Sequence, residues 1–383
     1  MVSAVICEYN PFHNGHKYQL EQMKKNSDAV ICIMSGDFVQ RGSASVYDKF
    51  TRAKAALLSG ADLVIMLPCA YSLSPAEIFA FGGVSLCDSL GIVGSLYFGS
   101  ECGSISELSE AAKILLGEPV EVSEKIRELL AGGISYPAAR AKAFSEFIAP
   151  AVLKEPNNIL AIEYIKALMR LESKINPITI MRRTAGHHDV TASEGIASAT
   201  AIRRFISDKE DFHDYVPENV YELYKSSTPA NIENLYSVLA YTLRTKSAQE
   251  LSRINEVAEG LENRLKSSVY QCKSYSELAV FVKSKRYTQS KINRILLSVL
   301  LNIDKNLPKS KPEYIRVLGM NKKGMELLSE IKRKSRLPII TKTADYKGLC
   351  ASFEADILAS DLYMICCGSP RFGIDYITGP VII

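Results

Sequence analysis

The chain begins, after its first methionine, with VSAVICEYNPFHNGH at residues 2–16. Val2–Cys7 is apolar and contains β-branched residues, which predicts a short strand buried in a sheet. A helix is expected over Lys17–Lys25, so the polar segment between the two connects a strand to a helix. Open α/β sheets bind their ligands at the carboxyl ends of the strands. This opening segment therefore predicts both an α/β fold and the position of its site.

Two histidines, His13 and His16, stand at the start of that helix in the pattern H-x-G-H, although the chain has only five histidines. A helix amino terminus presents free backbone N–H groups and a partial positive charge, which favours a bound phosphate. Gly15 lets the backbone come close, and the two imidazoles can stabilise the charge on the α- and β-phosphates as pyrophosphate leaves. The pattern therefore predicts an ATP site in which His13 and His16 are catalytic, without a covalent protein intermediate.

Further apolar runs predict more strands of the same sheet. They are apolar enough to be covered on both faces, which is typical of parallel strands in βαβ units. We expect these strands at Ala29–Met34, Leu63–Leu67, Ser95–Phe98 and Ile178–Met181. The segment Ser74-Pro75-Ala76-Glu77 has the spacing of a capping box at a helix start. The predicted fold class is α/β, with a Rossmann-like domain that has a parallel sheet over residues 1–206.

The pattern changes after about residue 207. Long amphipathic segments with no clear strands between them predict a helical domain at 207–307. Its helices are expected over Asn231–Lys246, Ala248–Val269, Ser274–Lys285 and Ser290–Asn302. Strand-like and helical runs alternate again in 308–383, beginning with Tyr314–Leu318. We interpret this last part as a small α/β segment appended to the helical domain.

Composition sets the broad class. The 383 residues are 47% hydrophobic and 23% charged, with nine cysteines and a formal net charge of +4. No apolar run approaches the roughly 20 residues that span a bilayer, and the start lacks a secretion signal, so we expect a cytoplasmic protein with no membrane partner. The cysteines are an odd number and form no C-x-x-C pair, which indicates reduced and mostly buried thiols.

A second anion-binding signal follows the last expected strand, in EGIASATAIR at residues 194–203. It resembles an ISSTxIR element of nucleotidylyltransferases. The hydroxyls of Ser198 and Thr200 at a helix start, and the cation of Arg203, could contact the β- and γ-phosphates. The alternative is that Ser198 only caps the helix and Arg203 is a solvated charge. Together with the histidines, however, these residues would bracket a triphosphate, and Arg203 would be a third catalytic residue.

Positive charge gathers in the C-terminal half. Residues 283–294 contain five cations and no acid: Lys283, Lys285, Arg286, Lys291 and Arg294. With Tyr287 available for stacking, this basic segment could follow an RNA backbone. The alternative is a solvated helix face. We favour tRNA binding by the helical domain.

Several motifs together resemble the tRNA(Met) cytidine acetate ligase family. They are EYNPFHNGH at residues 8–16, MSGDFVQRG at 34–42, FGSE at 98–101, PNNIL at 156–160 and the stretch 182–189, in that order. The resemblance covers essentially the whole chain and implies that the Rossmann-like domain of residues 1–206 is a nucleotidyltransferase domain. It implies that ATP and acetate form acetyl-adenylate, and that the acetyl group passes to N4 of the wobble cytidine of elongator methionine tRNA.

The resemblance also implies a set of ATP-binding residues. Gly99, Asn157 and Arg182 would complete the nucleotide site, although Asn158 and Arg183 are chemically as suitable as their neighbours. The full set of residues expected to contact ATP is Cys7, Glu8, Tyr9, Asn10, Pro11, Phe12, His13, Asn14, Gly15, His16, Lys17, Tyr18, Gln19, Leu20, Gly99, Asn157, Arg182, Ser198 and Thr200.

Other residues keep two interpretations. Asp37, Gln40 and Arg41 follow the second strand, where they either frame acetate or the target base, or satisfy a loop backbone. His187 and His188 are expected to pack or to face RNA, because adjacent histidines point in different directions and suit a metal poorly. No metal-ligand set is expected, and Mg²⁺ enters only as the companion of ATP.

Two rival functions use the same features. One is a small-molecule nucleotidylyltransferase that joins AMP to a phosphorylated cofactor precursor, and the other is a non-catalytic RNA-binding protein that has kept a nucleotide fold. The long helical half argues against the first, and the intact histidines argue against the second. Carboxylate selectivity, tRNA identity and the oligomeric state lie beyond the sequence.

Overall fold

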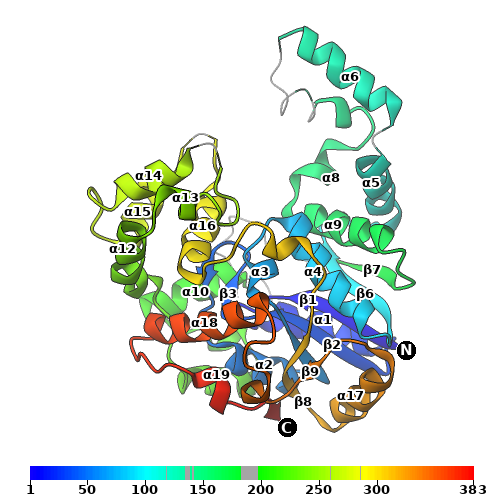
Figure 1. Cartoon of the computed structure of the whole chain (residues 1–383). Helices are drawn as coiled ribbons and strands as arrows, with labels where there is room; N and C mark the ends of the chain where they lie inside the picture. Colours follow the sequence, from blue (N-terminus) through cyan, green and yellow to red (C-terminus); the bar gives the residue numbers. More distant parts are fainter. Residues whose placement is uncertain (118, 134–138, 140–141, 183–196, 259, 285) are drawn as a thin grey trace.

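A central sheet with helices on both faces organises the molecule (Figure 1). The computed structural model describes residues 1–117, 119–133, 139, 142–182, 197–258, 260–284 and 286–383. The sheet has the order β10-β8-β5-β2-β1-β6-β7, with β9 pairing to β8. Its strands are β1 (Val2–Cys7), β2 (Ala29–Ser35), β5 (Leu63–Leu67), β6 (Val93–Ser100), β7 (Asn176–Met181), β8 (Ile315–Met320), β9 (Ile339–Ile340) and β10 (Val381–Ile382). A separate hairpin joins β3 (Phe38–Val39) to β4 (Ser43–Ala44).

The parallel sheet expected from the apolar runs is confirmed. Strands β1, β2, β5, β6 and β7 pair in parallel, and β2 and β5 are buried at every position. Parallel strands that are covered on both faces are apolar along their whole length, and for this reason they can be predicted from the sequence. Their carboxyl ends meet at one edge of the sheet. That edge carries the site described below.

The C-terminal segment differs from expectation. Instead of forming an appendage, β8 pairs antiparallel to β5 and extends the main sheet, and β10 and β9 add to it in parallel. Strand β8 is buried at all six positions. A short strand cannot bury both of its faces by itself, so the apolar strand β8 is stabilised by joining the main sheet. Residues 308–383 thus share one sheet with residues 1–206.

Buried charges hold the C-terminal segment to the first domain. The Lys49 ammonium lies 3.3 Å from a carboxylate oxygen of Asp37 and 2.9 Å from one of Asp375, which also pairs with Arg316 at 3.2 Å. All four side chains are nearly inaccessible to solvent. Asp37 is therefore occupied inside the protein. The interpretation in which it frames acetate or the base is wrong, because its carboxylate balances a buried lysine.

Most helices of the first domain lie against the faces of the sheet, whereas α6 (Val120–Ala131) extends away from it in Figure 1. The helices of this domain are α1 (Asn14–Lys24), α2 (Lys49–Leu58), α3 (Cys69–Ser72), α4 (Ala76–Ser89), α5 (Ile105–Gly117), α6, α8 (Pro150–Lys154), α9 (Pro156–Arg170) and α10 (Ala199–Asp208). The capping box expected at Ser74 is absent. Its hydroxyl donates to the Ala70 carbonyl at 2.7 Å, and helix α4 begins after Pro75 without a side-chain cap.

The helices of residues 207–307 gather on one side of the molecule, to the left in Figure 1. They include α11 (Glu218–Lys225), α12 (Tyr236–Thr245), α13 (Ala248–Leu251), α14 (Leu261–Ser268), α15 (Tyr275–Val282) and α16 (Gln289–Leu301). The long helix expected over Ala248–Val269 is two helices. Glu256 and Gly260 between them have positive φ angles of 62° and 81°, which interrupt an α-helix.

The remaining short elements complete the chain. Helices α17 (Lys322–Lys334), α18 (Ala351–Cys366) and α19 (Ile374–Ile377) belong to the C-terminal segment, and 3₁₀ turns lie at His213–Tyr215, Ile232–Leu235, Leu307–Lys309 and Thr343–Tyr346. In the part of the chain that the structure describes, no helix has the length and apolarity needed to cross a membrane. All nine cysteines are free thiols, and five of them are buried.

Candidate active site

The two histidines of the first β-α junction lie face to face. His13 is the N-cap of α1, and the Gly15 N–H donates to its Nδ1 at 3.0 Å. The ring of His16, one turn on, stacks on that of His13 with centroids 3.7 Å apart. The Nδ1 of His16 is buried and has no hydrogen-bond partner. A buried polar atom without a partner is unusual, and here it points to a bound group.

The environment keeps both rings neutral. Burial lowers the pKa of His13 to about 3, with further lowering by the nearby cations of Arg182 and Arg203. Burial, His13 and Arg182 likewise lower the pKa of His16 well below its ordinary value. Neutral imidazoles can each donate one hydrogen bond at physiological pH. An anion placed beside them would also offset the repulsion from the two arginines.

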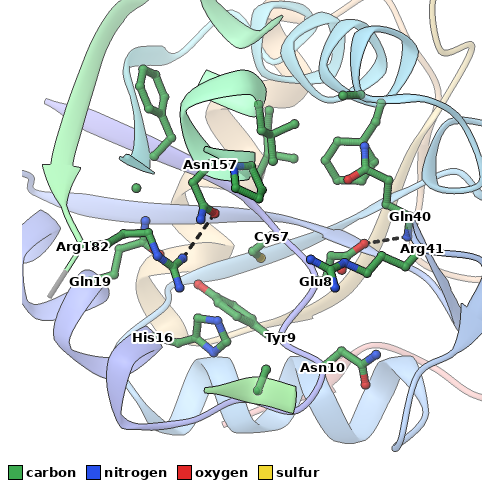
Figure 2. Close-up of a pocket in the computed structure, with 18 of the residues that line it drawn as sticks. Cys7, Glu8, Tyr9, Asn10, His16, Gln19, Gln40, Arg41, Asn157 and Arg182 are labelled. Carbon is green, nitrogen blue, oxygen red and sulfur yellow. Dashed lines mark hydrogen bonds between the residues drawn. The ribbon is translucent and has the colours of Figure 1, made fainter. Parts of the chain in front are cut away.

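Two adjoining cavities open at the carboxyl edge of the sheet, with volumes of about 300 Å³ and 710 Å³. They share much of their lining. The residues that line both are Glu8, Asn10, His16, Arg41, Pro156, Asn157, Arg182, Ala199 and Arg203. Figure 2 shows Glu8 and Arg41 on one side of the smaller cavity and Arg182 and Asn157 on the other. The combined space is large enough for a nucleotide.

Three arginines line both cavities, and Arg204 also lines the larger one, which gives the cavities a positive character. Arg203 on α10 donates to the Asn10 carbonyl at 2.7 Å and to the Thr200 hydroxyl at 2.8 Å. Arg182 follows β7 and lies 3.4 Å from the Asn157 side-chain oxygen. Arg41 lines both cavities from the loop after β3. Guanidinium groups that surround two neutral histidines suit a polyphosphate, since each can donate several hydrogen bonds to phosphate oxygens.

Comparisons with known proteins agree with this geometry. A family model described as HIGH Nucleotidyl Transferase matches residues 1–372. The tRNA(Met) cytidine acetate ligase of Thermoanaerobacter sp. (strain X514) is 43% identical, with 98% of each chain covered. The enzyme of that name from Clostridium perfringens (strain ATCC 13124) is 40% identical over 100% of this chain and 99% of the relative.

A solved structure also matches over its full length. The crystal structure of Thermotoga maritima TmcAL bound with alpha-thio ATP superimposes with a TM-score of 0.90 at 32% identity, covering 100% of this chain and 99% of that one. This chain belongs to the tRNA(Met) cytidine acetate ligase family. The resemblance seen in the motifs is therefore confirmed, and so is the nucleotidyltransferase fold.

The two neighbouring asparagines, Asn157 and Asn158, have different surroundings. Asn158 is buried, and its side-chain oxygen accepts from the backbone N–H groups of Glu101 and Cys102 at 2.9 and 3.2 Å. Asn157 instead lines both cavities beside Arg182. The chain thus uses Asn158 to bond its own backbone and leaves Asn157 at the cavity. Arg183, His187 and His188 lie outside the described residues.

Gly99 lies where β6 passes Arg182. A Cβ added at Gly99 would come within 3.2 Å of the Arg182 side chain, so a larger residue would displace that guanidinium. The Arg182 N–H also donates to the Ser100 carbonyl at 2.9 Å. Gly99 and Arg182 are therefore placed together by the pairing of β6 with β7, as the expected ATP site requires.

The residues expected to contact ATP divide into two groups. Cys7, Glu8, Tyr9, Asn10, His16 and Gln19 line the smaller cavity, and His13, Ser198 and Thr200 line the larger one. Ser198 also caps α10, since its hydroxyl oxygen accepts from the Ala201 N–H at 3.1 Å. Seven others line neither cavity: Pro11, Phe12, Asn14, Gly15, Lys17, Tyr18 and Leu20. Of these, Pro11, Phe12 and Leu20 are buried.

Arg52 supports the site and was not singled out from the sequence. It is fully buried on α2, and its guanidinium donates to the carbonyls of Tyr47 at 2.9 Å, Glu8 at 2.6 Å and Ser35 at 3.1 Å, and also to that of Gly36. It thus binds together the carboxyl ends of β1 and β2. The sequence of α2 gives no sign that two of its cations, Lys49 and Arg52, point inward.

The basic segment of residues 283–294 is only partly available to RNA. Arg294 is buried, and its guanidinium pairs with both carboxylate oxygens of Glu256 at 2.5 and 2.8 Å. The expectation that Arg294 contacts RNA is wrong, because its charge is already neutralised inside the protein. Lys283 and Arg286 are exposed, and the Lys291 ammonium lies 4.7 Å from the Tyr287 ring centre. Lys285 is outside the described residues.

No group of three histidine, cysteine or carboxylate side chains that could hold a metal ion occurs in the described ranges. The polar groups around the cavities are instead donors and cations. Chemically, the arrangement can bind a polyanion, stabilise charge on its phosphates and exclude water from the reacting centre. Two carboxylates also line the cavities: Glu8 lines both, whereas Glu210 is exposed and lines only the larger one.

Proposed function

We propose that this chain activates acetate with ATP to give acetyl-adenylate, and then acetylates N4 of the wobble cytidine of elongator methionine tRNA. The observation that carries the proposal is the stacked His13–His16 pair, in which the buried Nδ1 of His16 lacks a partner beside three cavity-lining arginines. Membership of the acetate ligase family supports the choice of substrates. A cytoplasmic location belongs to the proposal because the substrate is tRNA.

In the first half-reaction, an acetate oxygen attacks the α-phosphate and pyrophosphate leaves. His13 and His16 would donate to the phosphate oxygens, where negative charge grows in the transition state. Arg203, with Ser198 and Thr200 at the start of α10, would hold the departing β- and γ-phosphates. Mg²⁺ would accompany ATP and be bound mainly by phosphate oxygens and water.

The nucleoside end of ATP would occupy the smaller cavity. Gly99 keeps space open there, and Asn157 and Arg182 present polar groups toward it. Aromatic and aliphatic side chains, including Phe98, Leu160 and Tyr164, line the same cavity and suit a base or a small acyl group. The proposal assigns this role to Asn157 and not to Asn158, because the Asn158 side-chain oxygen already accepts from two backbone N–H groups.

In the second half-reaction, the cytosine amino group attacks the acetyl carbon and AMP leaves. The helical domain would deliver the anticodon loop, with exposed Lys283 and Arg286 contacting the RNA backbone. A small-molecule nucleotidylyltransferase would use the same phosphate-binding residues. It is not favoured, because such an enzyme has little need for the basic helical half, and the relatives are named as tRNA ligases.

The test is transfer of carbon-labelled acetate to total tRNA, with and without ATP, followed by nucleoside analysis of the product. The proposal predicts ATP-dependent label in N4-acetylcytidine from methionine tRNA. ATP–pyrophosphate exchange without labelled RNA would instead favour the small-molecule rival. RNA binding with no nucleotide turnover would favour a non-catalytic protein.

A further inference from the structure

Glu8 is a carboxylate at the junction of two cavities that are otherwise rich in cations. It lines both cavities, and Arg41 and Arg203 line them with it. In Figure 2, Glu8 lies across the smaller cavity from Arg182. A negative side chain weakens the binding of ATP and acetate through simple repulsion. Its presence here therefore calls for a role other than holding these two anions.

Hydrogen bonds hold the Glu8 side chain and backbone in place through one carboxylate oxygen and the main-chain carbonyl. The Gln40 N–H donates to Oε1 of Glu8 at 2.7 Å, and the buried Arg52 guanidinium donates to the Glu8 backbone carbonyl at 2.6 Å. Among the described residues, none donates a hydrogen bond to Oε2. One oxygen thus fixes the side chain, and the other can meet a substrate.

The two half-reactions differ in their need for a base. Acetate is already ionised near neutral pH, so adenylation releases no proton from the nucleophile. The cytosine amino group must lose a proton when it becomes an amide nitrogen, and its lone pair is a poor nucleophile. A positioned general base helps such a step by typically 10²- to 10⁴-fold. Only the acetyl transfer therefore requires a proton acceptor.

We propose that the Glu8 carboxylate accepts the proton of the attacking amino group during acetyl transfer, an inference that rests on the proposed function. The N4 lone pair forms the bond to the acetyl carbon, and the bond from that carbon to the phosphate oxygen breaks. AMP leaves with the electron pair of that bond. The N4 proton passes to Oε2 of Glu8 and then to solvent.

Other titratable groups of the cavities fit this role less well. Glu210 is a second carboxylate, but it is exposed and lines only the larger cavity. Burial holds the pKa of His13 at about 3 and lowers that of His16, so both rings are weak bases. Burial raises the pKa of Glu8, and the Gln40 N–H, Arg52, Arg203 and Arg41 act in the opposite direction. Tyr164 of α9 also lies within electrostatic range. Groups whose pKa values are driven apart in one site commonly divide the roles of acid and base.

The test is Glu8→Gln, measured separately in the two half-reactions of the full-length enzyme. Glutamine keeps an oxygen that can accept from the Gln40 N–H, so the local fold is retained. Adenylation needs no base, so we expect acetate-dependent ATP–pyrophosphate exchange at saturating ATP and acetate to change much less than the transfer step, although the loss of a negative charge can alter how tightly both anions bind. Single-turnover transfer from enzyme-bound acetyl-adenylate to tRNA should fall by roughly 10²- to 10³-fold.

Glu8→Asp is the matched variant, since it keeps a carboxylate but withdraws it by one methylene. It should recover part of the transfer rate. The transfer rate of the unmodified chain should also fall as acid protonates Glu8, and the Glu8→Gln variant should lose this dependence.

Three results would overturn the inference. Equal losses in exchange and transfer would mean that Glu8 positions the arginines or the nucleotide. An altered Mg²⁺ requirement for exchange would make it a metal ligand, and unchanged rates in both steps would give it no role. If the unmodified chain transfers no acetyl group at all, the proposed function fails, whereas exchange and transfer that survive in Glu8→Gln refute only the role of Glu8 as the base.

Discussion

The β1–α1 junction and the basic segment of residues 283–294 were both expected to bind anions, but their polar groups are used differently. At the junction, His16 has a buried Nδ1 without a partner, and Arg41, Arg182 and Arg203 face two cavities. In the basic segment, the Arg294 charge is neutralised by Glu256, 38 residues away in the chain. The β1–α1 junction thus presents polar groups to a cavity, whereas one cation of the basic segment is already paired inside the protein.

This difference shows that a count of charges predicts binding poorly. An anion site at a helix amino terminus with two histidines can be predicted from the sequence, because its hydrogen-bond donors belong to neighbouring residues. The availability of a cation depends on partners that are distant in sequence. Removing each kind of group in turn tests whether the two regions differ in this way.

The largest expected effect comes from Arg294→Met. Removing one member of a buried ion pair leaves the Glu256 carboxylate uncompensated, which we expect to lower the free energy of unfolding by about 3 kcal/mol. Urea denaturation measures this loss. The double variant Arg294→Met with Glu256→Gln is the matched control and should recover part of it. Unchanged stability with weaker, less salt-dependent tRNA binding would restore Arg294 as an RNA-binding residue.

A smaller effect concerns pH and the histidines. In the unfolded chain His13 takes up a proton below its ordinary pKa of 6.5, but in the folded chain it does so only near 3. The unfolded state therefore binds more protons between these values, and stability falls as the pH falls through them. At pH 5 the loss from His13 is about 2 kcal/mol.

The control for this pH effect is His13→Asn, which keeps an acceptor for the N-cap of α1. Denaturation midpoints at pH 7 and pH 5 should differ less in this variant than in the unmodified chain. An equal difference in the two proteins would mean that His13 is not held neutral by its surroundings. The basic segment contains no histidine, so its variants should leave the pH dependence unaltered.

The smallest effect is expected from Lys283→Glu and Arg286→Glu. Each substitution removes a cation that would bind a phosphate, so it should weaken tRNA binding several-fold and lower the slope of log affinity against log salt by about 1. A binding titration at several salt concentrations measures both. Arg333→Glu on α17, which lies away from α16 in Figure 1, is the matched control. Equal weakening in all three variants would indicate only a general charge effect.

The sequence predicted the fold where its signals were local. The buried runs of β1, β2 and β5, and the H-x-G-H junction, lie within segments whose neighbours in the chain determine their structure. The expected capping box at Ser74 was wrong because its hydroxyl found the Ala70 carbonyl instead of the helix start. The apolar run of β8 predicts a strand, but its partner β5 lies about 250 residues earlier in the chain. Nothing in the sequence around β8 indicates this pairing.

The candidate site shows the same division. The motifs single out His13, His16 and Arg203. They leave Asn157 and Asn158 open, and the difference lies in tertiary contacts: the Asn158 side-chain oxygen accepts from backbone N–H groups, whereas Asn157 lines both cavities. Arg52 and Asp37 point inward to tertiary partners that no spacing reveals. The sequence therefore does not show whether a polar side chain is available to bind a ligand or already forms hydrogen bonds and ion pairs within the protein.

The His13–His16 pair is proposed to serve the activation of acetate by ATP, and the rest of the proposed function depends on this step. It can be tested by acetate-dependent ATP–pyrophosphate exchange, measured for the unmodified chain and for His16→Ala. We predict exchange that requires acetate and falls by roughly 10²- to 10³-fold in the variant. Exchange that needs no acetate, or that His16→Ala sustains at the original rate, would contradict this role of the histidines.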